Sequence, residues 1–229
     1  MNTIQITHLG QSHRLPGDLQ PSPEILELVV DSQLKVANYI KEHPNALVFK
    51  EGLIENQFGI NEHEVSFLAK FLFPHGLPND SSKLSSEKKE FIYNMGAVGI
   101  MNCLGELTTI YKTRTPEENA DIEFLIDKGE DHRLILAFEE KSAMNCIQKV
   151  LKKKTNVNEV ILVYGDFHNF ESYCGELGFK YEKICCVSSL IIGKAYLAQN
   201  NTPVEKEEEG QTPIIQKKPI VNKKNIIRV

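Results

Sequence analysis

Short apolar runs alternate along the chain with longer stretches in which apolar residues recur every three or four positions. The short runs are typical of buried strands, and the longer stretches are typical of amphipathic helices. The strand-like runs are Thr3–Leu9, Ala46–Lys50, Leu107–Lys112, Glu159–Tyr164 and Lys180–Val187. The helix-like stretches are Pro23–His43, Glu62–Phe73, Glu87–Leu104, Thr115–Asp127, His132–Lys154 and Phe170–Leu177. This order predicts an α/β fold with a largely parallel central sheet flanked by helices.

Local signals support the predicted helix boundaries and weaken one helix. Ser22 can cap the first helix, whose first turn contains a proline. Thr115 and Glu118 have the spacing of a capping box, in which each side chain accepts a hydrogen bond from the other residue's backbone. Gly96 and Gly99 fall inside the third helix-like stretch. Glycines at these positions either weaken that helix or allow a neighbouring element to pack closely.

Composition and charge are those of an ordinary globular protein. Of the 229 residues, 41% are hydrophobic and 25% are charged. The length suits a single domain, alone or followed by a tail. The formal net charge is -5, so we expect no nucleic acid among the partners. The chain contains no apolar run of about 18 residues, so we expect no transmembrane segment.

The compartment is predicted from the N-terminus and the cysteines. The first residues lack the basic segment and apolar stretch of a secretory signal. The five cysteines are an odd number, and no two of them form a Cys-x-x-Cys pair. Neither a disulfide framework nor a cysteine zinc site is therefore expected. We expect a cytoplasmic protein, or one that is secreted without a classical signal peptide.

The composition changes from about Gln199 onwards. Asn, Pro, Glu and Lys dominate there, and only scattered isoleucine and valine residues remain. Such a segment cannot bury enough apolar surface to offset the loss of chain entropy on folding. The sequence therefore predicts one domain over residues 1–198 and a disordered charged tail over residues 199–229. The tail could solvate the chain, act as a secretion or targeting signal, or dock a protein partner.

Two strand-like runs end in the same pattern, Gly-x-x-His. The run IQITHLGQSH ends with Gly10 and His13, and the run ILVYGDFH ends with Gly165 and His168. A third strand-like run is followed directly by Glu51. Because ligands bind outside the carboxyl ends of parallel strands, we expect both histidines and the glutamate to converge at one sheet edge. The glycines would let the backbone turn sharply there and approach a ligand.

A carboxylate also falls within the apolar face of the predicted helix over residues 132–154. Glu140 lies in the middle of a stripe formed by Leu136, Met144, Ile147 and Leu151. A buried carboxylate is costly unless it is paired or hydrogen-bonded, so we expect a partner for it. Lys141 lies at the edge of the stripe and could be that partner or could reach the site. The alternative is that Glu140 extends into solvent or that the helix is rotated.

These motifs together resemble the superfamily of Tiki, TraB, ChaN-like and erythromycin esterase proteins. Gly10 and His13 match the first motif of that superfamily, and Gly165 and His168 match the second. Glu51 matches the acid that ends the second strand. The resemblance covers about residues 3–187 in the same order, and it implies the same α/β fold.

The resemblance extends to the segment FEEKSAMNCIQKVLKKKTNVNEVILVYGDFH. This segment is similar to the family's helix that carries Glu-Arg-Asn followed by Met, and Glu140 matches the glutamate. The chain departs from the pattern at Lys141, where the family usually has arginine, and at Ser142, where it has asparagine. Lysine keeps the charge but loses the planar bidentate fork. The family's way of orienting a substrate carboxylate or oxyanion therefore does not carry over directly.

The resemblance implies a hydrolase whose site contains His13, Glu51 and His168, together with Glu140 and Lys141. Two chemistries remain open. In the first, a histidine accepts a proton from water and a carboxylate orients that histidine. In the second, His13, Glu51 and His168 ligate a divalent metal ion and leave a position for water. The substrate, a small molecule or a peptide, is not specified by either chemistry.

Three other functions are weighed against the hydrolase. The ChaN-like branch resembles haem-binding lipoproteins, and Tyr93 or Tyr164 could supply an axial ligand. The chain shows no signal or lipidation cysteine near its start, however, so we do not expect haem. A second alternative is a non-catalytic scaffold that binds a host or partner protein through its tail. A third is a metallophosphoesterase, which GDFH resembles, although no Gly-Asn-His follows.

Overall fold

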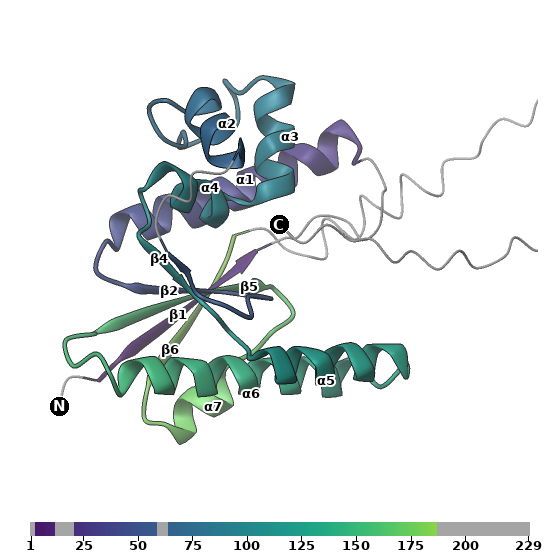
Figure 1. Ribbon diagram of the computed structural model, residues 1–229, viewed down its shortest axis with the longest axis vertical. Helices are drawn as coiled ribbons and strands as arrows, with labels where there is room; N and C mark the ends of the chain where they lie inside the picture. Colours follow the sequence, from purple (N-terminus) through teal and green to yellow (C-terminus); the bar gives the residue numbers. More distant parts are fainter. Residues whose placement is uncertain (1–2, 12–20, 59–63, 187–229) are drawn as a thin grey trace, which may run out of the picture.

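The computed structural model describes residues 3–11, 21–58 and 64–186. Within these ranges six strands form one sheet in the order β3-β4-β2-β5-β1-β6 (Figure 1). The strands are β1 Gln5–Gln11, β2 Leu47–Lys50, β3 Gln57–Phe58, β4 Thr109–Tyr111, β5 Glu159–Gly165 and β6 Lys180–Cys185. Every neighbouring pair is parallel except β3 and β4, which are antiparallel. The predicted α/β fold with a largely parallel sheet is confirmed.

Helices cover both faces of the sheet. They are α1 Pro23–Glu42, α2 Glu64–Leu72, α3 Ser86–Met95, α4 Ala97–Leu104, α5 Pro116–Asp127, α6 His132–Leu151 and α7 Glu171–Glu176. Figure 1 shows α1 to α4 on one face and α5 to α7 on the other. Among the described residues, no helix combines the length and apolar character needed to cross a bilayer.

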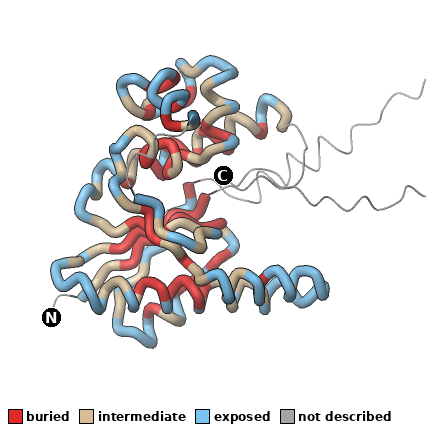
Figure 2. Tube along the Cα trace, viewed as in Figure 1, coloured by how far each residue is buried: buried red, intermediate tan, exposed pale blue. Residues whose placement is uncertain are grey.

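Each face of the sheet has its own apolar core, and the central strand β5 contributes to both. Ile161 and Val163 pack with α1 and α4, whereas Leu162 and Tyr164 pack with α6. Successive side chains of a strand point to opposite faces, so a strand buried on both sides reads as an unbroken apolar run. Figure 2 shows the buried residues concentrated in the sheet and on the helix faces that meet it. Burial on both faces therefore holds β5 in place in the sheet.

The two helix starts predicted from capping residues, at Ser22 and Thr115, are confirmed in detail. The Ser22 side chain accepts a hydrogen bond from the backbone N–H of Ile25 at the start of α1. Thr115 and Glu118 form the predicted capping box at the start of α5. These caps satisfy backbone donors that have no partner within the helix.

The structure differs from the sequence prediction in two elements. The single helix predicted over residues 87–104 is two helices, α3 and α4, which are separated at Gly96. Gly96 has φ 71° and ψ 150°, a conformation that a residue with a Cβ atom adopts at a cost. The two-residue strand β3 was not predicted. The tail predicted over residues 199–229 lies outside the described residues.

The carboxyl ends of β2 and β5, which are neighbours in the sheet, lie side by side at one edge of it. The helices that come after β2 and β3, α2 to α4, cover one face of the sheet, whereas α7, which follows β5, lies on the opposite face (Figure 1). Adjacent parallel strands whose connections leave to opposite faces form the usual ligand crevice of an open α/β sheet.

Candidate metal and catalytic site

Glu51 lies at the carboxyl end of β2 and is tied to β5. Its backbone N–H donates to the Val163 carbonyl at 3.0 Å, which continues the strand pairing by one residue. Its Oε2 accepts a hydrogen bond from the Gly165 N–H at 2.6 Å. The other carboxylate oxygen, Oε1, lies 3.4 Å from Nε2 of His168. The acid predicted at the strand end therefore faces the second predicted motif.

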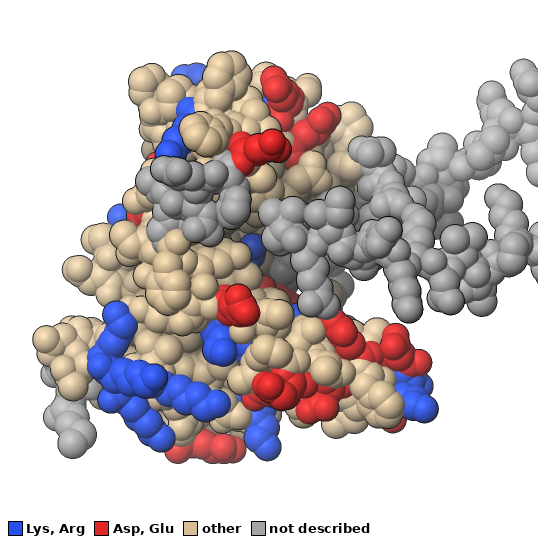
Figure 3. Space-filling model, viewed as in Figure 1, with Lys and Arg blue, Asp and Glu red and all other residues tan. Residues whose placement is uncertain are grey.

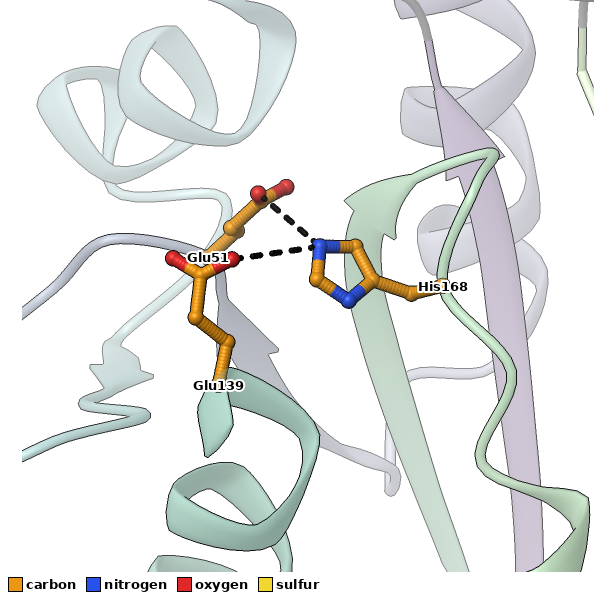
Figure 4. Close-up of side chains that lie close together, drawn as sticks. All are labelled: Glu51, Glu139 and His168. Carbon is orange, nitrogen blue, oxygen red and sulfur yellow. Dashed lines mark ion pairs between the residues drawn. The ribbon is translucent and has the colours of Figure 1, made fainter. Parts of the chain in front are cut away.

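His168 follows β5 after a tight turn, in which its N–H donates to the Gly165 carbonyl at 3.2 Å. The residue is only 2% exposed. Its ring lies edge-on to Tyr164, with centroids 4.9 Å apart, and nearly parallel to Phe170 at 6.0 Å. Aromatic packing therefore fixes the imidazole. Figure 4 shows Nε2 facing the carboxylates of Glu51 and Glu139.

Glu139 and Arg114 belong to the same cluster, and the sequence reasoning missed both. Oε2 of Glu139, on α6, lies 3.7 Å from His168 Nε2. Oε1 of Glu139 accepts a hydrogen bond from Nη1 of Arg114 at 2.9 Å. Arg114 follows β4, the strand beside β2. The sequence held a signal for each of them. Glu139 directly precedes Glu140, the acid in the apolar stripe, and Arg114, like Glu51, follows the end of a strand.

Glu140 is buried, as its place in the apolar stripe predicts. Its Oε1 accepts a hydrogen bond from the Asn169 N–H at 2.8 Å and lies 3.4 Å from His168 Nδ1. The contact with Nδ1 has the distance of an ion pair but not the geometry of a hydrogen bond, so Nδ1 is a buried atom without a hydrogen bond. This buried carboxylate therefore has the partner expected for it, and that partner is the turn after β5.

Of the two roles considered for Lys141, the pairing with Glu140 is not among the described contacts, and its reach into the site stays a prediction. Lys141 is exposed, and the described contacts of Glu140 are made by Asn169 and His168 instead. Successive residues of an α-helix point about 100° apart, so a lysine next to a buried glutamate faces a different direction. The guanidinium in the cluster comes from Arg114, outside α6.

His13 lies outside the described residues, so its place in the site stays a prediction. The strand that precedes it is described, and β1 runs beside β5 with Gln11 opposite Gly165. A Cβ atom on Gly10 would lie 2.7 Å from Oδ1 of Asp166, so a larger residue there would have to displace that side chain. The neighbour that comes close to Gly10 is therefore the turn after β5, and the predicted approach of Gly10 to a ligand stays a prediction.

The carboxylates dominate the electrostatics of the cluster. Burial by itself lowers the pKa of His168, but Glu140, Glu51 and Glu139 outweigh burial and raise this pKa from 6.5 to about 9. Burial and the neighbouring charge of Glu51 raise the pKa of Glu139, against the opposing effects of His168 and Arg114. Without a further cation, the imidazole is therefore protonated at neutral pH.

Three atoms in this cluster are arranged as metal ligands. Nε2 of His168 and one oxygen each of Glu51 and Glu139 all lie within 4.8 Å of one another. Ligand atoms about 2.0–2.2 Å from one ion lie roughly 3–4 Å apart. The distances of 3.4 Å and 3.7 Å from the imidazole to the two carboxylates fall in this range. One imidazole and two carboxylates suit several first-row divalent cations.

Comparison with known proteins adds no relative. No protein-family model, no curated protein and no solved structure matches the chain. The resemblance to the Tiki, TraB, ChaN-like and erythromycin esterase superfamily therefore remains an expectation from the motifs.

Proposed function

We propose that this chain is a hydrolase that activates water with a divalent metal ion held by Glu51, Glu139 and His168. The observation that supports the proposal is that the two oxygens of each carboxylate have different partners. Each holds a protein N–H donor with one oxygen, Gly165 for Glu51 and Arg114 for Glu139, and turns its other oxygen towards the same Nε2. Oxygens fixed in this way need little rearrangement to ligate an ion.

The balance of charge supports a metal over a histidine that acts alone as a base. A general base must be unprotonated near the working pH, and the pKa of about 9 keeps His168 protonated at neutral pH. The described cluster holds three carboxylates, from Glu51, Glu139 and Glu140, against Arg114 and His168. A divalent cation would replace the imidazole proton and neutralise the remaining negative charge.

The other residues of the cluster have supporting roles in this proposal. Glu140 lies beside Nδ1 of His168, and an acid in that position orients a ligating imidazole and raises its basicity. Arg114 holds Glu139 in place, and Nε of Arg114 is buried without a hydrogen bond. His13 remains the predicted further ligand. The bound metal would lower the pKa of a ligated water, which supplies the nucleophile for hydrolysis.

The test begins with the metal, because the substrate is unknown. The full chain is titrated with Mn²⁺, Co²⁺ and Zn²⁺ by calorimetry and by equilibrium dialysis. We expect one ion per chain, and Glu51→Gln, Glu139→Gln and His168→Ala should each weaken its binding by at least about tenfold. Glu171→Gln is the matched control, since Glu171 is an exposed acid on α7.

Activity is then measured on a panel of chromogenic esters, phosphate esters and peptides, with the preferred metal and with a chelator. We expect turnover on at least one class that disappears with the chelator and in the His168→Ala chain. Turnover that persists in both conditions would overturn the metal-assisted mechanism. Metal binding that is equal in Glu139→Gln and Glu171→Gln would overturn the site.

The structure gives no support to the haem alternative. Tyr93 and Tyr164, the tyrosines considered as axial ligands, are 7% and 2% exposed and lie within the two apolar cores. The Tyr164 ring packs against His168 and Phe170. A tyrosine oxygen in this environment is not presented to a ligand as large as haem.

A further inference from the structure

A cavity of about 480 Å³ lies beside the sheet edge formed by β3 and β4 and near the C-terminal end of α6. This volume is in the range of about 300–1,000 Å³ that small-molecule sites occupy. Lys149, which lines the cavity, follows Glu139 by ten residues, or about 15 Å along a helix. The cavity is therefore separate from the metal ligands on α6.

Four lysines line this cavity, and no acidic residue is among its described lining residues. Lys149, Lys153 and Lys154 belong to the end of α6 and the turns after it, where a cation also complements the helix dipole. Lys112 has no such explanation, because it follows β4. The charge of Lys112 also acts on Glu117, but that residue does not line the cavity. Figure 3 shows basic side chains gathered over this end of α6.

Two aromatic rings accompany the lysines. Phe58, on β3, lines the cavity and is 64% exposed. Tyr111 is buried, with its ring stacked on Phe49 at 5.0 Å between centroids and with Lys154 Nζ 5.8 Å from its ring centroid. A cavity that combines clustered cations with an accessible ring suits an anion that carries a planar group.

We propose that this cavity binds a mononucleotide, with its phosphate among Lys112, Lys149 and Lys153 and its base against Phe58. The lysines supply charge but no planar surface, and the phenylalanine supplies a planar surface but no charge. A ligand that uses both combines an anionic group with a flat ring, and a nucleotide does so with its phosphate and its base. The inference is independent of the proposed metal site.

The test is calorimetric titration of the full chain with AMP, adenosine and inorganic phosphate at low ionic strength. A chelator is present throughout, so that no metal at Glu51, Glu139 and His168 can hold the phosphate. We expect AMP to bind more tightly than either adenosine or phosphate. Phe58→Ala should weaken AMP and adenosine binding about fivefold or more and leave phosphate binding unchanged.

The role of the lysine charges is tested with Lys152 and Lys153, which are neighbours in the chain. Both lysines are exposed, but Lys153 lines the cavity and Lys152 does not. Lys153→Glu should weaken AMP binding about tenfold or more, while Lys152→Glu, with the same change in net charge, should weaken it about twofold. Circular dichroism confirms that each variant folds, and Lys149→Gln replaces Lys153→Glu if that chain does not.

Three results would overturn the proposal. The first is the absence of AMP binding at concentrations up to about 5 mM. The second is an equal loss of affinity in Lys152→Glu and Lys153→Glu, which would mean that only the general field attracts the anion. The third is equal binding of AMP and phosphate, which would mean that the ring is not recognised.

Discussion

At the scale of single residues, the central feature is an imidazole whose two nitrogens both face carboxylates. Nε2 of His168 faces Glu51 and Glu139, and Nδ1 faces Glu140. Replacing a buried ion cluster with apolar side chains is often neutral or stabilising, so the cluster is not well explained as a source of stability. The proposed metal ion would give the cluster a role, because the carboxylates and the imidazole would hold the ion together.

Removing the imidazole should be costly, because the carboxylates then lose a buried counter-charge. We expect His168→Gln to lower the free energy of unfolding by about 2–4 kcal/mol in urea denaturation at pH 6.5 with a chelator. His43→Gln is the matched control. His43 pairs with Glu159, but their side chains are 32% and 23% exposed, and such a pair contributes about 1 kcal/mol or less. Equal losses in the two variants would contradict the electrostatic account.

The raised pKa of His168 also predicts a pH dependence of stability. Its folded-state pKa of about 9 exceeds the ordinary value of 6.5, so the stabilisation is fully present below pH 6.5 and is lost as the pH rises through 9. This contribution to the free energy of unfolding is on the order of 3 kcal/mol. We expect the difference in unfolding free energy between the unmodified chain and His168→Gln to shrink over this window, in the absence of metal.

The unmodified chain must be compared with His168→Gln because other groups also titrate near pH 9. Burial raises the pKa of Cys186 to about 11 and that of Cys174 to about 12, so the unfolded thiols ionise first and stability falls above about pH 9. Both chains contain these cysteines, and the difference cancels their effect. A difference that stays constant from pH 6 to about pH 9.5 would contradict the raised pKa of His168.

Some site residues could be predicted from the sequence because their positions follow simple periods. Glu51 and His168 follow predicted strands, and Glu140 interrupts an apolar stripe. Glu139 neighbours that acid and Arg114 follows a strand, but these signals were not enough to place the two residues in the site. Their contact depends on the rotation of α6 and on β4 lying next to β2, and neither is a local property of the sequence.

At the scale of elements, the break between α3 and α4 depends on Gly96. With φ at 71°, an added side chain would be strained, and its Cβ atom would lie 3.3 Å from Oε1 of Gln33. That oxygen accepts the hydrogen bond from the Ala97 N–H at 2.9 Å, so it cannot move away freely. The glycine is therefore required by both its backbone conformation and its neighbour.

We expect Gly96→Ala to lower the free energy of unfolding by about 1–3 kcal/mol. Gly99→Ala is the matched control, since Gly99 lies inside α4 and an added Cβ atom meets nothing within 4 Å. That change should be neutral or should stabilise the chain by up to about 1 kcal/mol, because alanine favours the helix more than glycine does. Urea denaturation of the two variants measures both effects, and equal destabilisation would contradict the account of Gly96.

The elements themselves were predictable where burial or capping imposes a clear pattern. β5 reads as an unbroken apolar run because both of its faces are buried, and α5 begins at a complete capping box. The break at Gly96 could not be placed, since a glycine within a helical pattern can also be tolerated. β3 has two residues, both exposed, and its pairing with β4 leaves no periodic signal.

At the scale of the whole molecule, the candidate site joins two layers. Glu51 and His168 follow strands of the central sheet, whereas Glu139 belongs to α6, which packs on one face of that sheet. Glu139 contacts the strand ends through ion pairs with Arg114 and His168, and Glu140 adds contacts with His168 and Asn169. An ion ligated by Glu51, Glu139 and His168 would add to the apolar packing that already joins α6 to the sheet.

Metal binding should therefore stabilise the entire chain against heat. An ion that binds only the folded state at about 100 times its Kd adds about 2.7 kcal/mol, which corresponds to a rise in Tm of roughly 5–10 °C for a chain of this size. The rise is measured by calorimetric scans with and without the preferred metal. Glu139→Gln should lose about half of this rise or more, because the ligand from α6 is then missing and binding is about tenfold weaker or worse, whereas Glu171→Gln should retain it. A rise of the same size in Glu139→Gln would mean that the stabilising ion binds without α6, and the proposed coupling of the two layers would be wrong.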